Sequence, residues 1–154
     1  MCFLRSELIP LYGLAAYSRF HQRTRMTHRL RGVPVISIID DDESMRHGTM
    51  RLVRSLGFVA HAFPSAHAFL KSEQLTKTAC LISDVQMPEM SGIQLQDALR
   101  ARGLNIPVIF ITAFHDDKVR AQALGRGATC FLSKPFDGET LSRCIKAALQ
   151  DEHQ

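Results

Sequence analysis

The sequence predicts an α/β fold in which five helices cover a doubly wound, five-stranded parallel sheet. Short apolar runs rich in β-branched residues alternate with longer amphipathic segments from Pro34 onward, and this alternation is typical of repeated strand–helix units. The chain of 154 residues is 45% hydrophobic and 22% charged, which is ordinary for a globular protein. This length favours one domain with a substantial buried core.

The predicted strands are short and mostly apolar. The first covers residues 35–39, where a β-branched run without polar alternation indicates a strand buried on both faces. The same pattern predicts the other strands at 58–62, 79–83, 107–111 and 129–132. Each strand is separated from the next by one helical segment, so consecutive strands are expected to lie parallel.

Capping residues and glycines mark the helices between these strands. The first helix begins at Ser44 and ends at Gly57, because glycine readily takes the left-handed conformation that closes a helix. A short second helix is capped by Ser65, whose hydroxyl can accept a hydrogen bond from the first turn. The remaining helices are predicted from Gly92 to near Gly103, from Asp116 or Asp117 to Gly125, and from Asp137 to Leu149.

Polar side chains stand where four of the predicted strands end. They are Asp40 and Asp41 after the first strand, Asp84 after the third, Thr112 after the fourth and Lys134 after the fifth. In open parallel sheets the functional crevice lies beyond the carboxyl ends of the strands. We therefore expect these side chains to converge on one site.

This set of side chains suits a divalent cation and a phosphoryl group. Three neighbouring carboxylates repel one another unless a cation lies among them, and Mg²⁺ prefers oxygen ligands of this kind. Lys134 and Thr112 could contact phosphoryl oxygens, and an aspartate can itself act as the nucleophile. The sequence contains neither GxxxxGK[ST] nor GxGxxG, so no P-loop or dinucleotide site is predicted.

Four motifs occur in order along the chain. They are the acid pair Asp40-Asp41, the segment DVQMPEMSG at 84–92, ITA at 111–113 and FLSKPF at 131–136. Together they resemble the receiver domain of two-component response regulators, over about residues 34–149. The GF pair at 57–58 followed by SAHAFL at 65–70 is most similar to the FixJ-type branch. The resemblance implies a flavodoxin-like receiver fold.

The resemblance also implies roles for the matching residues. Asp84 would accept a phosphoryl group from a phosphohistidine on a sensor histidine kinase or phosphotransfer protein. Asp41 and Asp84 would bind Mg²⁺ with the backbone carbonyl of Gln86, and Asp40 would orient a metal-bound water within the same metal site. The chain would then be a signalling protein and not an enzyme.

The remaining implied roles concern the response to phosphorylation. Thr112 and Lys134 would contact the phosphoryl group, the rotamer of Phe131 would follow Thr112, and the Lys134–Pro135 peptide bond would be cis. The face formed by the fourth helix, fifth strand and fifth helix would change with phosphorylation. It would contact a downstream protein target or a second copy of the chain as a homodimer.

Two other functions are compatible with parts of the sequence. A haloacid-dehalogenase-like phosphatase could use Asp40 as its nucleophile, but this reading leaves Asp84 without a role. A binding module could retain the fold and act without phosphorylation. FixJ-type regulators usually carry a DNA-binding domain after the receiver, whereas this sequence stops at Gln154. We therefore expect no direct binding to nucleic acid, and the chain would be either a stand-alone receiver that acts through protein contacts or a truncated longer regulator.

The positive charge is concentrated at the N-terminus. Residues 1–33 contain six Arg and one Glu without Lys or Asp, whereas the whole chain has a net charge of +4. The basic character therefore belongs to this segment and not to the folded domain. We expect a disordered extension at 1–33, or a true start at Met26, followed by a receiver domain at 34–150 and a short tail at 151–154.

The cysteines and the hydropathy bear on the cellular compartment. Cys2, Cys80, Cys130 and Cys144 are widely spaced and form no CxxC pair, so we expect reduced thiols with neither a disulfide nor a zinc site. No apolar run reaches the roughly 18 residues that a membrane span needs. The expected location is the cytoplasm, without a membrane partner.

Overall fold

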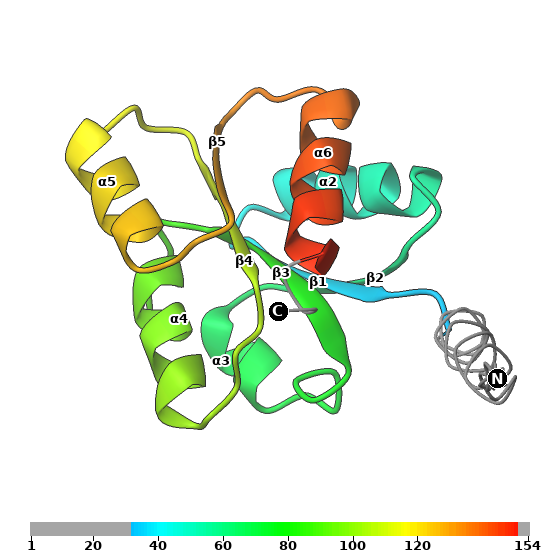
Figure 1. Ribbon diagram of the computed structural model, residues 1–154, viewed down its shortest axis with the longest axis horizontal. Helices are drawn as coiled ribbons and strands as arrows, with labels where there is room; N and C mark the ends of the chain where they lie inside the picture. Colours follow the sequence, from blue (N-terminus) through cyan, green and yellow to red (C-terminus); the bar gives the residue numbers. More distant parts are fainter. Residues whose placement is uncertain (1–31, 151–154) are drawn as a thin grey trace, which may run out of the picture. The chain divides into compact units, whose positions relative to one another are not determined.

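The computed structural model describes residues 32–150, so the tail at 151–154 and residues 1–31 of the expected N-terminal extension lie outside the described residues. Within this range the strands are β1 (Val35–Ile39), β2 (Val59–Phe63), β3 (Thr78–Asp84), β4 (Val108–Thr112) and β5 (Cys130–Ser133). They form one parallel sheet in the order β2-β1-β3-β4-β5 (Figure 1). The predicted fold class is confirmed.

Helices connect the strands as the capping pattern predicted. Their bounds are α2 (Glu43–Ser55), α3 (Ala66–Leu70), α4 (Gly92–Ala101), α5 (Asp117–Gly125) and α6 (Gly138–Gln150). α2 begins one residue before the predicted Ser44, because Asp42 is the N-cap and its side chain accepts a hydrogen bond from the Met45 N–H. At α4, Ser91 and Gln94 form a reciprocal capping box, which satisfies two N–H groups at the helix start.

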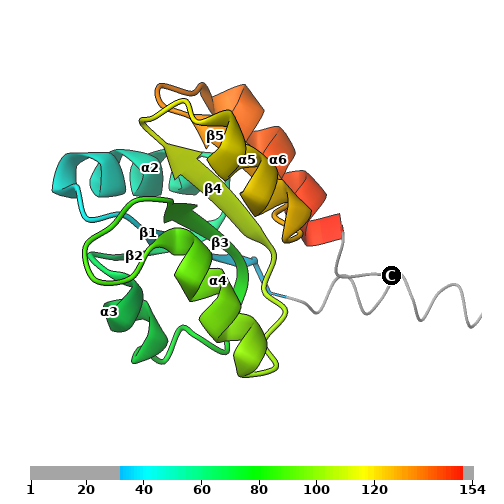
Figure 2. The same cartoon turned by 90° about the vertical axis from the view of Figure 1, so that its left-hand side faces the viewer.

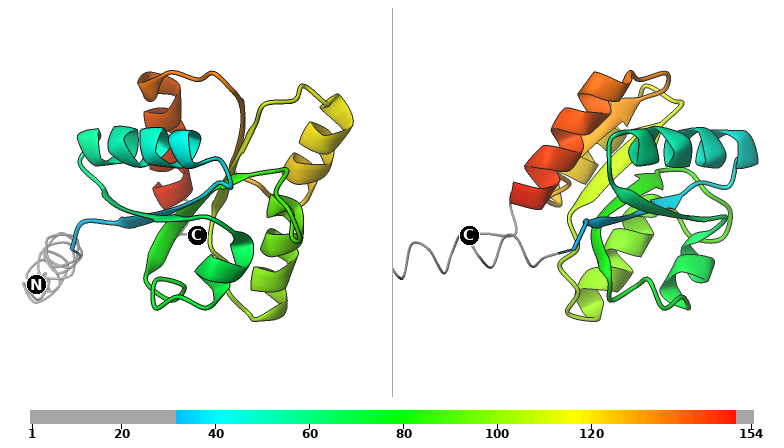
Figure 3. Two further views of the ribbon diagram at one scale, coloured as in Figure 1. Left: turned by 180° about the vertical axis from the view of Figure 1, so that it is seen from behind. Right: turned by 90° about the vertical axis from the view of Figure 1, so that its right-hand side faces the viewer.

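The helices lie on both faces of the sheet (Figures 2 and 3). Side chains alternate along each strand, so Cys80 and Ile82 of β3 pack with residues of α2 and α6, such as Val53 and Ile145. Leu81 faces the opposite side, where α3, α4 and α5 contribute to a second cluster. Both faces of the central strands are therefore buried, and the polar strand ends are left for the site.

Gly92, the first residue of α4, lies directly against the end of β3. A Cβ at this position would collide with the Asp84 carbonyl oxygen and would come within 2.9 Å of Ser83 Oγ and 3.0 Å of Phe110 Cε1. The Gly92 N–H also donates to the Val85 carbonyl at 2.9 Å. The glycine therefore permits close approach of α4 to the strand that carries Asp84.

Replacing Gly92 with alanine will lower the free energy of unfolding by about 1–3 kcal/mol, because the added methyl group forces the backbone of β3 and α4 apart. Urea denaturation measures this loss. Gly48→Ala is the matched control: a Cβ at Gly48, inside α2, meets nothing within 4 Å. That change should raise stability by roughly 0.5–1 kcal/mol. Equal effects of the two substitutions would contradict the packing argument.

A disulfide joins Cys130 of β5 to Cys144 of α6, with their Cα atoms 5.9 Å apart. The expectation of unpaired thiols is therefore wrong for these two residues. The sequence separation of 14 is not a recognised cysteine spacing. The two residues meet because Cys130 is on the side of the sheet that α6 covers, and Cys144 is on the inner face of that helix.

Candidate functional site

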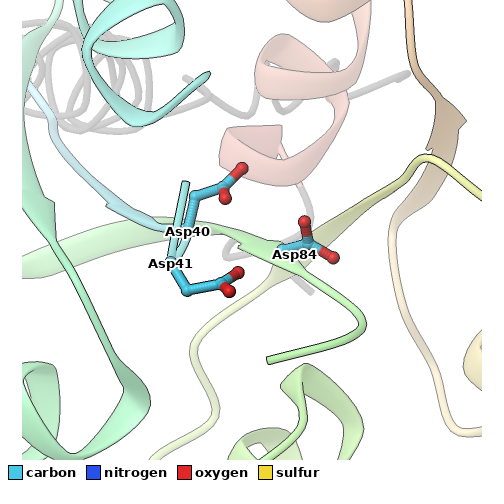
Figure 4. Close-up of side chains that lie close together, drawn as sticks. All are labelled: Asp40, Asp41 and Asp84. Atoms are coloured by element: carbon cyan, nitrogen blue, oxygen red, sulfur yellow. The ribbon is translucent and has the colours of Figure 1, made fainter. Parts of the chain in front are cut away.

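Three carboxylates meet at the carboxyl edge of the sheet. Asp40 and Asp41 directly follow β1, and Asp84 is the last residue of β3, the neighbouring strand. One oxygen from each carboxylate lies within 4.8 Å of the others (Figure 4). Asp40 and Asp84 are only 5% and 9% exposed, whereas Asp41 is open to solvent. The predicted convergence of these acids is present.

Lys134 joins two of these acids. Its ammonium Nζ donates to Asp84 Oδ2 at 2.7 Å and to Asp40 Oδ2 at 3.0 Å, and its side chain is 13% exposed. It reaches the acids from the loop between β5 and α6, where the Lys134–Pro135 peptide bond is cis, as the resemblance implied. A largely buried cation thus stands between two largely buried carboxylates.

Backbone N–H groups fix the other oxygen of each carboxylate. The Asp42 N–H donates to Asp40 Oδ1 and the Gln86 N–H donates to Asp84 Oδ1, both at 2.9 Å. Each acid is therefore held between one backbone donor and Lys134. This arrangement fixes the orientation of the Asp40 and Asp84 carboxylates.

Burial and ion pairing act in opposite directions on the titration of these groups. Burial raises the pKa of Asp40 above its ordinary value, although the hydrogen bonds from Lys134 and from the Asp42 N–H oppose the shift. For Lys134, burial lowers the pKa, but the hydrogen bonds to Asp84 and Asp40 outweigh it and the net pKa is raised. Lys134 is thus a cation at neutral pH.

Thr112 and Phe131 belong to adjacent strands beside the acids. Thr112 is 3% exposed; its Oγ1 accepts a hydrogen bond from the Phe114 N–H at 3.1 Å, and its carbonyl accepts from the Lys134 N–H at 2.8 Å. Phe131 pairs in register with Phe110, and its ring is buried in the α3, α4 and α5 cluster. β4 and the lysine loop are thus directly connected.

The donor chemistry of this site fits a hard divalent cation. Carboxylate oxygens within 4.8 Å of one another, one of them exposed on Asp41, are the ligands that Mg²⁺ prefers, and Mg²⁺ is usually held by one or two carboxylates with water in its other positions. Gln86 is exposed at the mouth of the site. Asp40, Asp41 and Asp84 could therefore hold Mg²⁺.

Two contacts around the site were not predicted from the sequence. The Arg46 guanidinium Nη1 donates to the Asp40 carbonyl oxygen at 2.9 Å, which ties α2 to the end of β1. His115 Nδ1 lies 3.2 Å from Ser133 Oγ, which links the loop after β4 to the residue before Lys134. Nothing in the spacing of His115 and Ser133 indicates their contact.

Comparisons with known proteins identify the family to which most of the chain is similar. The protein-family model described as the response regulator receiver domain matches residues 36–146 of this chain. The response regulator protein TodT of Pseudomonas putida is 37% identical over 139 residues, which cover 90% of this chain and 61% of TodT. The chain thus spans less than two thirds of the length of this curated relative.

Solved structures share the fold. A structure of the response regulator StyR has 40% sequence identity and a TM-score of 0.71, covering 77% of this chain and 60% of that chain. The crystal structure of FixJ-N has 31% identity and a TM-score of 0.72, covering 80% and 98% respectively. The likeness to FixJ agrees with the branch that the sequence motifs resembled.

Proposed function

The chain belongs to the response regulator receiver domain family, and we propose that it is a phosphoacceptor of a two-component phosphorelay, phosphorylated on Asp84. The observation that carries the proposal is the position of Asp84, whose Oδ2 lies 2.7 Å from Lys134 Nζ and whose neighbours are Asp40 and Asp41. A carboxylate held between a cation and a metal-binding acid pair is suited to phosphoryl transfer.

Asp40, Asp41 and Asp84 would hold Mg²⁺, with the backbone carbonyl of Gln86 as a further ligand. When bound, Mg²⁺ neutralises charge on phosphoryl oxygens. Lys134 supplies a second positive charge from the opposite loop, and it is already directed at Asp84. The Thr112 hydroxyl would donate a hydrogen bond to the phosphoryl group, which it can do while it accepts from the Phe114 N–H.

The transfer step uses the Asp84 carboxylate as the nucleophile. One carboxylate oxygen attacks the phosphorus of a phosphohistidine on a sensor histidine kinase or phosphotransfer protein, and an O–P bond forms. The N–P bond breaks, and its electron pair remains on the imidazole nitrogen. Both oxygens of Asp84 begin in hydrogen bonds, to the Gln86 N–H and to Lys134, so one of these contacts yields to the phosphoryl group.

Phosphorylation would change the face formed by α5, β5 and α6. A phosphoryl group adds about two negative charges next to Lys134, whose backbone N–H is bonded to the Thr112 carbonyl. Thr112 would move toward the phosphoryl oxygens, and Phe131 would turn into the space that it leaves. A downstream protein target or a second copy of the chain would bind one state of this face in preference to the other.

The proposed receiver domain spans residues 34–150, and its proposed location is the cytoplasm, where sensor kinases present their phosphohistidines. Among residues 32–150 no helix has the length and apolar character to cross a membrane. Receiver domains are generally signalling domains without an enzymatic activity of their own. No observation favours the alternative in which Asp40 is the nucleophile of a phosphatase.

Incubation with Mg²⁺ and acetyl phosphate will add one phosphoryl group to the chain, as intact-protein mass spectrometry can measure. Removing Mg²⁺ with EDTA will abolish phosphoryl uptake, because the negatively charged carboxylates and the negatively charged acetyl phosphate would then repel one another. Restoring excess Mg²⁺ is the control. Uptake that persists in EDTA would contradict the metal assignment, and steady release of phosphate from a phosphomonoester would support the phosphatase instead.

A further inference from the structure

The Cys130–Cys144 disulfide lies outside the phosphoacceptor site. Cys130 is the first residue of β5. This edge strand pairs only with β4 among the described strands. Cys144 is 7% exposed within the cluster that joins α6 to the sheet. The bond is therefore a covalent link between an edge strand and the helix that covers it.

The two cysteines differ in their access to solvent. Cys130 is partly exposed, whereas Cys144 is buried. Cys130 is the more exposed of the two residues, so we assign to it the first exchange with a small disulfide in solution. The Cys144 sulfur lies next to it for the second step. In the cytoplasm, the location proposed above, disulfides that form are usually transient or redox-sensing.

We propose that Cys130 and Cys144 are a reversible redox modification site that a low-molecular-weight disulfide such as oxidised glutathione can oxidise. The Cys130 thiolate attacks the glutathione disulfide, forming a mixed disulfide and releasing one glutathione thiolate. The Cys144 thiolate then attacks the Cys130 sulfur, and the second glutathione leaves. Two cysteine sulfurs are oxidised and one glutathione disulfide is reduced to two glutathione thiolates, which take up the two protons that the cysteine thiols lose.

The crosslink restrains the strand that carries the lysine loop. Cys130 points to the α6 side of β5, whereas the next residue, Phe131, points to the opposite cluster. Three residues further along, Lys134 contacts Asp84. With the disulfide closed, β5 is held by its hydrogen bonds to β4 and by a covalent bond to α6. With the thiols reduced, only the hydrogen bonds and packing remain.

The test equilibrates the full chain in glutathione buffers that run from oxidising to reducing, followed by alkylation and peptide mass spectrometry. We expect Cys130 and Cys144 to be crosslinked at the oxidising end and both alkylated at the reducing end. The crosslinked fraction at each buffer composition should be the same whether the chain starts oxidised or reduced. Three results would overturn the proposal: both thiols alkylated throughout, a lasting mixed disulfide with glutathione, or a crosslink that no reducing buffer opens.

Thermal unfolding and amide exchange test the restraint. The oxidised chain should melt on the order of ten degrees higher than the reduced chain, given the short loop that the bond closes, and amides of β5 and α6 should exchange more slowly. Cys80→Ala, which removes a buried thiol from the same cluster, should keep this difference, whereas Cys144→Ser should lose it. If Cys144→Ser does not fold, comparing the oxidised and reduced forms of the unsubstituted chain still tests whether the disulfide restrains β5 and α6. Equal melting and exchange in both states would refute the restraint.

Discussion

Asp84→Asn will abolish the uptake of a phosphoryl group from acetyl phosphate in the presence of Mg²⁺. The amide nitrogen and oxygen are far weaker nucleophiles than the carboxylate, and the change also removes one of the charged ligands that we propose for Mg²⁺. The side chain keeps its size, so the hydrogen bond that the Gln86 N–H donates at this position can persist. Intact-protein mass spectrometry and circular dichroism together separate loss of the reaction from loss of the fold.

Asp97→Asn is the matched control for this experiment. Asp97 is an aspartate on α4 that pairs with Arg126 near the surface, and it is not among the grouped carboxylates. Its substitution should leave phosphoryl uptake unchanged. If the Asp84→Asn chain still accepted one phosphoryl group at the rate of the unsubstituted chain, the phosphoacceptor would be a different residue. Asp40 and Asp41 would then be the next candidates.

The sequence carried enough information to predict the sheet and the group of acids, because both depend on local patterns. Buried parallel strands are short apolar runs, and a polar residue at the end of such a run lies at the carboxyl edge of the sheet. Asp40 and Asp84 are therefore predictable as neighbours once β1 and β3 are adjacent. That adjacency belongs to the flavodoxin-like strand order, which the family resemblance implied and which the alternation of strands and helices alone does not determine.

Contacts between side chains of different elements could not be predicted in the same way. Cys130 and Cys144 meet because β5 turns one face to α6, and no spacing rule encodes which face that is. The hydrogen bond between His115 and Ser133 depends on the path of two loops. Lys134 was expected to contact a phosphoryl group, whereas in the structure it binds both Asp40 and Asp84.

This double contact gives Lys134 a role in stability that is independent of phosphorylation. Its ammonium is the cation that balances two carboxylates of 5% and 9% exposure. Lys134→Met keeps most of the side-chain stem but removes the charge, which leaves buried carboxylates without a partner. We expect a loss of about 3 kcal/mol in the free energy of unfolding without Mg²⁺. Urea denaturation provides the measurement.

The pH of this measurement matters because burial raises the pKa of Asp40. Without Lys134 that pKa should rise further, and protonation of Asp40 would then relieve the repulsion as the pH falls. The loss of unfolding free energy caused by Lys134→Met should therefore be largest at mildly alkaline pH, where Asp40 stays ionised. This loss should shrink as the pH falls. Lys146→Met, at an exposed position of α6, is the control and should change stability by less than about 0.5 kcal/mol.

Adding Mg²⁺ should restore more stability to Lys134→Met than to the unsubstituted chain. In the unsubstituted chain the cation competes with a lysine that already balances Asp40 and Asp84, whereas in the variant it replaces the missing charge. Ligand-linked stabilisation grows with the ratio of free ligand to its dissociation constant, so the melting temperature of the variant should rise more steeply with Mg²⁺ concentration. Equal slopes would mean that Lys134 and the cation do not share these carboxylates, and the proposed metal site would have to lie elsewhere.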